Sequence, residues 1–209
     1  MINWTFEAGL KTSADIVQVA TDSKKIYDLF SKDNVVMTSS SHLSGTDRVN
    51  EAVSKLNLSD EDVIINIQGD EPFINPEDIN NLFDLVSKKE IAMGTLYSDL
   101  KSLDELEDSN KVKILVNDGI ASNFFRETSL VNNIFIHQGV YAFKYKTLKS
   151  FVSWQPSDNE KKYKLEQFRA LDNGIKINAI KSVSKIHLGV DTEDDLKKAN
   201  EIAKDDSYK

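Results

Sequence analysis

The alternation of short apolar, β-branched runs with segments that carry helix signals is the feature that most constrains the fold. Such runs are typical of buried strands rather than of strands with one face in water. Strands that alternate with helices predict an α/β protein with a mainly parallel sheet covered on both faces. The expected strands of this first part are 15–20, 35–37, 63–67, 91–97 and 111–116.

Capping residues predict where the helices begin. Asn75 followed by Pro76 is typical of a helix start, because Asn caps the first turn and proline has no N–H to satisfy there. The other helices are expected over 24–30 with Asp22 as cap, over 47–56 with Thr46 as cap, from a capping box at Ser157 and Glu160 to Asn173-Gly174, and over 192–203.

The second half of the chain has a different pattern. The sequence Asn-Asp-Gly at 117–119 lies between two apolar runs and predicts a hairpin. Further strands are expected over 134–143 and 176–181. With no repeat and no linker, we expect one domain over 1–209 that carries an antiparallel insertion at 110–160.

Composition argues against several classes of partner. The 209 residues include 26 Lys+Arg and 34 Asp+Glu, which gives a formal net charge of −8. An acidic chain without a basic block is a poor ligand for nucleic acid or for an anionic membrane. There is no Cys, no apolar stretch long enough for a membrane span and no signal-peptide pattern at the N-terminus. We therefore expect a cytoplasmic protein.

Two acidic segments are candidates for a metal site. The segment QGDEP at 68–72 follows a buried strand, where ligands bind in open α/β sheets, and Asp70 there could face a metal-bound phosphate. The alternative is an acidic turn that opens the next helix. Asp191, in GVDT at 189–192, is either a second metal carboxylate or the N-cap of the last helix.

Scarce residue types mark further candidates. Only Arg48, Arg126 and Arg169 are arginine, so lysine serves almost everywhere else and these positions are candidates for a planar, bidentate donor. A structural ion pair is the alternative for each. His137 and Tyr141 share a strand face at period two with the gap of a glycine between them, which suits either a ligand pocket or ordinary cross-strand pairs.

Together the segments resemble one family closely, the 3-deoxy-manno-octulosonate (Kdo) cytidylyltransferases. The matching motifs are ATD at 20–22, HLSGTDR at 42–48, VIINIQGDEP at 63–72, FFR at 124–126, HQGVY at 137–141, WQPS at 154–157, LEQFR at 165–169 and GVDTEDDL at 189–196. The resemblance implies a nucleotide-diphospho-sugar transferase fold, which is a Rossmann-like three-layer α/β/α arrangement, and a homodimer. It also implies Mg²⁺ and the conversion of CTP and Kdo to CMP-Kdo and pyrophosphate, for lipopolysaccharide biosynthesis.

The resemblance also implies roles for individual residues. Asp70 and Asp191 match the Mg²⁺ ligands, and with Gln68 they are the expected catalytic set. The CTP side of the pocket is expected at Asp22, Ser44, Gly45, Thr46 and Arg48, and the Kdo side at Gln68, Arg126, His137, Tyr141, Glu166 and Gln167.

The N-terminus departs from the family pattern. Met1 aligns just after the family's first strand and basic phosphate loop, so an N-terminally truncated chain with little turnover of CTP is the expectation. The alternatives are a degenerate, non-catalytic paralogue that dimerises or binds a sugar, and a cytidylyltransferase for a related acid sugar.

Overall fold

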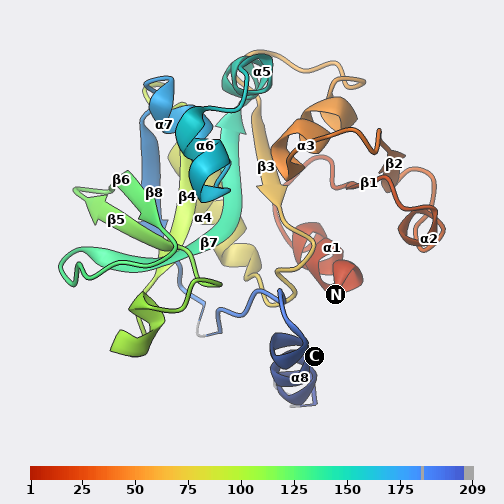
Figure 1. The fold of residues 1–209 in the computed structure, drawn as a ribbon. Helices are drawn as coiled ribbons and strands as arrows, with labels where there is room; N and C mark the ends of the chain where they lie inside the picture. The colour runs from red at the N-terminus through yellow and green to blue at the C-terminus, as the bar shows by residue number, and fades with distance from the viewer. Residues whose placement is uncertain (185, 205–209) are drawn as a thin grey trace.

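The computed structural model describes residues 1–184 and 186–204, and Figure 1 shows how their helices and strands are arranged. The helices are α1 (Ile2–Leu10), α2 (Lys24–Tyr27), α3 (Gly45–Val53), α4 (Pro76–Val86), α5 (Tyr145–Ser153), α6 (Asp158–Tyr163), α7 (Gln167–Asp172), α8 (Glu193–Ile202) and the 3₁₀ turn Leu103–Leu106. The strands are β1 (Val19–Thr21), β2 (Val35–Met37), β3 (Val63–Ile67), β4 (Met93–Ser98), β5 (Lys113–Asn117), β6 (Ile120–Phe125), β7 (Ile134–Lys144) and β8 (Ile177–Lys181).

Six strands form the main sheet in the order β3-β7-β4-β8-β6-β5, and β5 also pairs with the start of β7. β3, β4, β5 and β8 point one way, so the orientation is mainly parallel as predicted. The hydrogen-bonded neighbours are nevertheless mostly antiparallel, because β7 inserts between β3 and β4 and β6 between β8 and β5. The antiparallel segment expected at 110–160 therefore belongs to the main sheet. β1 and β2 form a separate parallel pair.

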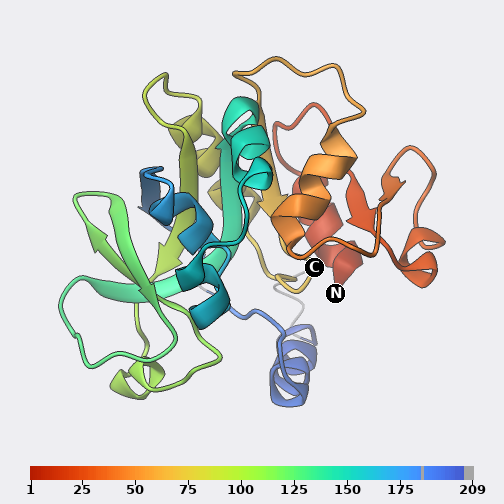
Figure 2. The same ribbon diagram turned by 45° about the horizontal axis from the view of Figure 1, so that its top comes forward.

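Helices cover both faces of this sheet, and β7 supplies side chains to both cores by strict alternation. Val140 and Ala142 pack with α4 and α1, whereas Tyr141 and Phe143 pack with α5 and α7. Figure 2 shows α5, α6 and α7 on the side of the sheet away from α4, with α8 standing apart below. The predicted α/β class is confirmed.

Several predicted ends are wrong. The strand expected over 15–20 forms only over Val19–Thr21, because its partner β2 is three residues long. The helix cap assigned to Asp22 is at Ser23. The cap assigned to Thr46 is at Ser44, whose Oγ accepts the Asp47 N–H at 3.2 Å, while Thr46 is fully buried.

The helix expected from Ser157 to Gly174 is two helices. Its capping box forms as predicted, but Lys164 adopts a left-handed conformation with φ 54° and ends α6. Guanidinium N–H groups of Arg126 donate to the carbonyls of Tyr163 and Lys164 at this break. The break matters because Glu166 and Gln167 follow it directly.

The hairpin prediction is confirmed. β5 and β6 pair antiparallel, and the turn residues Asp118 and Gly119 both have positive φ, 49° and 73°.

Across residues 1–184 and 186–204, no helix is long and apolar enough to span a bilayer.

Candidate functional site

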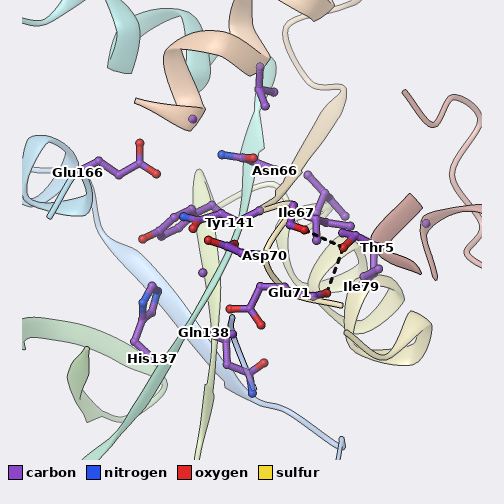
Figure 3. A pocket seen from close by; sticks show the side chains of 18 of the residues that line it. Thr5, Asn66, Ile67, Asp70, Glu71, Ile79, His137, Gln138, Tyr141 and Glu166 are labelled. Atoms are coloured by element: carbon purple, nitrogen blue, oxygen red, sulfur yellow. Dashed lines mark hydrogen bonds between the residues drawn. The ribbon is translucent and has the colours of Figure 1, made fainter. Parts of the chain in front are cut away.

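A cavity of about 2240 Å³ opens between β1 and β3 and runs across the end of β3. Most of the predicted site residues line it, from segments far apart in the sequence. These are Ser44, Gly45, Arg48, Gln68, Asp70, Arg126, His137, Tyr141, Glu166, Gln167 and Asp191. Two do not line it: Asp22 and Thr46. Figure 3 shows Asp70, Glu71, His137, Tyr141 and Glu166 around one open space.

The loop after β3 is held from α1. The Thr5 hydroxyl lies 3.4 Å from the Gly69 carbonyl oxygen and 3.3 Å from that of Glu71, as the dashed lines in Figure 3 mark. Thr5 is buried, so this contact is shielded from water. The loop is therefore fixed with its two carboxylates directed into the cavity rather than turned out as a solvated acidic turn.

Asp191 is brought to Asp70 by a backbone hydrogen bond. The Val190 N–H donates to the Asp70 carbonyl oxygen at 2.9 Å. Thr192 caps α8 and forms a capping box with Asp195. The alternative in which Asp191 serves as the cap is therefore wrong, and its carboxylate is available to the cavity.

Asp70 and Glu71 are partly or largely buried close to other negative charges. Burial, with the charge of Asp191, raises the pKa of Asp70. Burial, with the charges of Asp70 and Asp191, raises the pKa of Glu71 to about 7, against a hydrogen bond from the Gly139 N–H that lowers it. Like charges held together without a cation are costly, and a bound cation relieves that cost.

The donor set fits a magnesium ion that is shared with a phosphate. No group of three or more His, Cys, Asp or Glu residues suited to a metal ion occurs in the described part of the chain. Mg²⁺ typically takes only one or two protein carboxylates and completes its shell with water and substrate phosphates. Asp70 and Asp191 supply that number of hard oxygen ligands.

The position of Gln68 explains why the residue between His137 and Tyr141 is a glycine, Gly139. A Cβ at Gly139 would lie 3.0 Å from the Gln68 side chain. The missing side chain is thus the space in which Gln68 sits. His137 and Tyr141 share the same face, as predicted, with ring centroids 5.4 Å apart.

Glu166 and Gln167 present unpartnered polar atoms beside Tyr141. The Tyr141 hydroxyl donates to Gln167 Oε1 at 3.1 Å. Among the described residues, Gln167 Nε2 and Glu166 Oε2 are buried without a hydrogen-bond partner. Buried polar atoms are normally satisfied, so an acceptor and a donor from a ligand fit here. Burial raises the pKa of Glu166, opposed by the nearby polar groups of Ser44 and Thr46.

Most residues of the expected CTP side lie at the start of α3. Arg48 donates to the Thr38 hydroxyl at 2.7 Å and to Asp22 at 3.1 Å, so Asp22 reaches the site through Arg48. The hydroxyl of Thr46 accepts a hydrogen bond from the Asn66 amide at 3.2 Å. Thr46 therefore packs beneath the residues that line the cavity and does not face the cavity itself.

The Arg126 guanidinium is held by backbone carbonyl groups, so only part of it is available to bind a carboxylate. Its guanidinium donates to the carbonyl oxygens of Ser109, Tyr163 and Lys164 at 3.1–3.2 Å. Two of its five N–H groups remain for a ligand. The same contacts tie the residues just before Glu166 to the loop that precedes β5.

Arg169 is explained by a structural ion pair. It is 2% exposed and donates to both oxygens of Glu160 and to Asp47. Asp47 in turn accepts from the Ser44 hydroxyl at 2.8 Å. Arg169 thus links α6 and α7 to the start of α3 and does not line the cavity.

Sequence reasoning gave no role to three polar residues in or beside the cavity, Glu71, Thr95 and Gln138. Glu71 lies beside Asp70 in the same motif, and the pair of adjacent acids was the available signal. Thr95 and Gln138 lie in strands and have no local signal, because Thr is an ordinary strand residue and a single Gln in a strand is typical of a solvated face.

The chain is similar to known cytidylyltransferases along its whole length. A family described as "Cytidylyltransferase" matches residues 1–177. A 3-deoxy-manno-octulosonate cytidylyltransferase of Photobacterium profundum is 33% identical over 97% of this chain and 88% of its own. The enzyme of that name from Francisella tularensis subsp. holarctica is 34% identical over 97% and 87%.

Solved structures agree with the sequence comparison. A structure described as CMP:2-keto-3-deoxy-manno-octonic acid synthetase complexed with CTP superposes with a TM-score of 0.85 at 28% identity, covering 97% of this chain and 86% of that one. The Francisella tularensis 2-C-methyl-D-erythritol 4-phosphate cytidylyltransferase shares the fold, with a TM-score of 0.66 at 17% identity over 95% and 86%. The predicted nucleotidyltransferase fold is confirmed.

Proposed function

The chain belongs to the 3-deoxy-manno-octulosonate cytidylyltransferases, within the cytidylyltransferase family, and on that premise we propose how its cavity transfers CMP from CTP to Kdo. The observation that carries the proposal is the meeting of Asp70 and Asp191, 121 positions apart in the sequence, in the cavity that Glu166 and Gln167 also line. CTP is proposed to lie along Ser44, Gly45 and Arg48.

The acid sugar is proposed to bind between β7 and α7. Kdo carries one carboxylate and several hydroxyl groups, which need donors and acceptors of mixed type. Gln167 Nε2 offers a buried donor and Glu166 Oε2 a buried acceptor. Arg126 is the proposed partner of the sugar carboxylate, through the N–H groups that its carbonyl contacts leave free.

The reaction needs no covalent nucleophile from the protein. The anomeric hydroxyl oxygen of Kdo bonds to the α-phosphorus of CTP, the bond from that phosphorus to pyrophosphate breaks, and the hydroxyl proton leaves to water. Catalysis of this kind is mostly positioning and neutralisation of charge. Asp70 and Asp191 would hold Mg²⁺, which when bound neutralises the phosphate charge. Gln68, packed on Gly139, is proposed to orient the sugar at the same end of the cavity.

Product formation tests the proposal directly. We expect a species with the mass of CMP-Kdo, and an equal amount of pyrophosphate, when the chain is held in excess over CTP and supplied with Kdo and Mg²⁺. Excess enzyme makes slow turnover visible. An amino analogue of Kdo, supplied in parallel, tests the related acid sugar. Product from the analogue alone would assign the enzyme to that other sugar, and sugar binding without product would favour the non-catalytic alternative.

Arg126→Lys tests the carboxylate assignment. Lysine keeps the charge but loses the planar fork, so we expect kcat/KM for Kdo to fall by roughly 10- to 100-fold, mainly through KM, with a much smaller change for CTP. Arg48→Lys is the matched control on the expected CTP side and is expected to raise the KM for CTP instead. Equal losses for both substrates, with a lower melting temperature, would mean that Arg126 serves only to hold its three carbonyls.

Two further features are proposed from the family alone. The homodimer that the resemblance implies is measurable by sedimentation equilibrium. The proposed compartment is the cytoplasm, where CTP is available.

A further inference from the structure

β7 is irregular where it passes Thr95 of β4. Leu96 pairs with Gln138, but Thr95 pairs with Tyr141, so Gly139 and Val140 have no partner on β4. Irregular pairing of this kind redirects side chains and is common beside functional sites. Here it leaves the Gly139 N–H for Glu71 and the Val140 carbonyl for a side chain of β4.

The Thr95 side chain fills that position. Thr95 is fully buried, and its hydroxyl donates to the Val140 carbonyl oxygen at 2.8 Å. The hydroxyl oxygen of Thr95 also lies 2.9 Å from Nε2 of His137. A hydroxyl has one proton, and a carbonyl can only accept, so the Thr95 proton points to Val140. Nε2 of His137 must therefore carry the proton of the second hydrogen bond.

The surroundings of His137 keep its ring neutral. Phe124 packs against it edge-on with ring centroids 5.2 Å apart, and the Tyr141 ring lies tilted to it at 5.4 Å. Burial lowers the pKa of His137 to about 3, with no charged neighbour among the causes. No described residue forms a hydrogen bond to the other ring nitrogen, Nδ1, although His137 lines the cavity.

We propose that Thr95 is a positioning residue that holds His137 as its neutral Nε2–H tautomer, so that Nδ1 accepts a hydrogen bond from a hydroxyl group of the acid sugar. This rests on the proposed function, since it assigns a partner in the sugar subsite. The opposite tautomer would present an N–H, which a sugar hydroxyl meets with its oxygen instead. Thr95 thereby sets which end of a hydroxyl the site accepts.

Thr95→Val tests the proposal, because valine matches threonine in shape and lacks the hydroxyl. Nitrogen-15 NMR of histidine-labelled protein, with His137 assigned through His137→Gln, reports the tautomer in the free protein. We expect a protonated Nε2 and an unprotonated Nδ1 in the parent. In Thr95→Val the tautomers mix or reverse, and the KM for Kdo rises by about 5- to 10-fold, the scale of one hydrogen bond, while the KM for CTP changes less than about twofold. Thr95→Ser, which keeps the hydroxyl, should restore both readouts.

Ser182→Ala is the matched control, since Ser182 also has a buried hydroxyl, which donates to Asp78 away from the sugar subsite. It should lower stability without changing the His137 signals or the KM for Kdo. A Thr95→Val protein that keeps the Nε2–H tautomer and the parent KM would overturn the proposal. The tautomer is measured without substrate, so a chain that fails to use Kdo refutes the proposed function and leaves the His137 assignment standing on its own spectrum.

Discussion

Asp70→Asn is expected to lower kcat/KM by at least ~10²-fold, the scale of losing an electrostatic contact to the transition state. Asparagine keeps the shape of the side chain but removes one negative charge from the pair with Asp191. Asp191→Asn is expected to have an effect of similar size. The double variant should lose little more than either single one, because ligands of one ion act as a unit. Rates measured across a Mg²⁺ titration report the loss.

Asp194→Asn is the matched control for this prediction. Asp194 lies three residues from Asp191, is exposed and pairs with Lys197 at 2.8 Å. Its replacement should leave the rate and the Mg²⁺ dependence within about twofold, because an exposed pair contributes little. Variants at Asp70 and Asp191 with the activity of this control would remove the metal assignment.

Arg169→Met is expected to destabilise the fold by about 3–5 kcal/mol. Methionine fills much of the space of the aliphatic part of the arginine side chain, but it leaves Asp47 and Glu160 without their cation. These carboxylates are 16% and 11% exposed, so water compensates them poorly. The stacking of Arg169 on Phe151, 4.6 Å from the ring centroid, is also lost. Equilibrium unfolding in urea measures the change.

A second ion pair provides the comparison. Lys149 and Asp60 are 2.6 Å apart with side chains 47% and 64% exposed. Lys149→Met removes an equally short pair from the surface and should lower the free energy of unfolding far less than Arg169→Met does. If both substitutions lower the free energy of unfolding equally, burial is not the reason that the ion pairs of Arg169 stabilise the fold. Adding Asp47→Asn and Glu160→Gln to Arg169→Met should recover part of the loss, since no unpaired charge then remains.

Local patterns predicted the secondary structure wherever the local chemistry was unambiguous. The run 63–67 is β3 with the predicted limits, and the Asn-Asp-Gly turn forms the predicted hairpin, since both residues that need positive φ adopt it there. Prediction failed where two neighbouring residues compete for one role. Ser44 and Thr46 are both good caps, but Ser44 takes the cap position, while Thr46 lies inside the first turn of α3 and accepts a hydrogen bond from Asn66. For Asp191 the sequence left a cap and a metal carboxylate open, and the structure assigns the cap to Thr192.

The sequence by itself determined the fold class, the family and a set of polar residues that line the cavity, because each depends on residue types at fixed local spacings. Only the tertiary structure decided which of them act together. The Val190–Asp70 hydrogen bond brings Asp191 to Asp70, and the turn at Lys164 directs Glu166 and Gln167 inward. It also separated Arg169, enclosed by two carboxylates, from the cavity. Such outcomes depend on contacts between residues far apart in the chain, and local sequence carries no record of those distances.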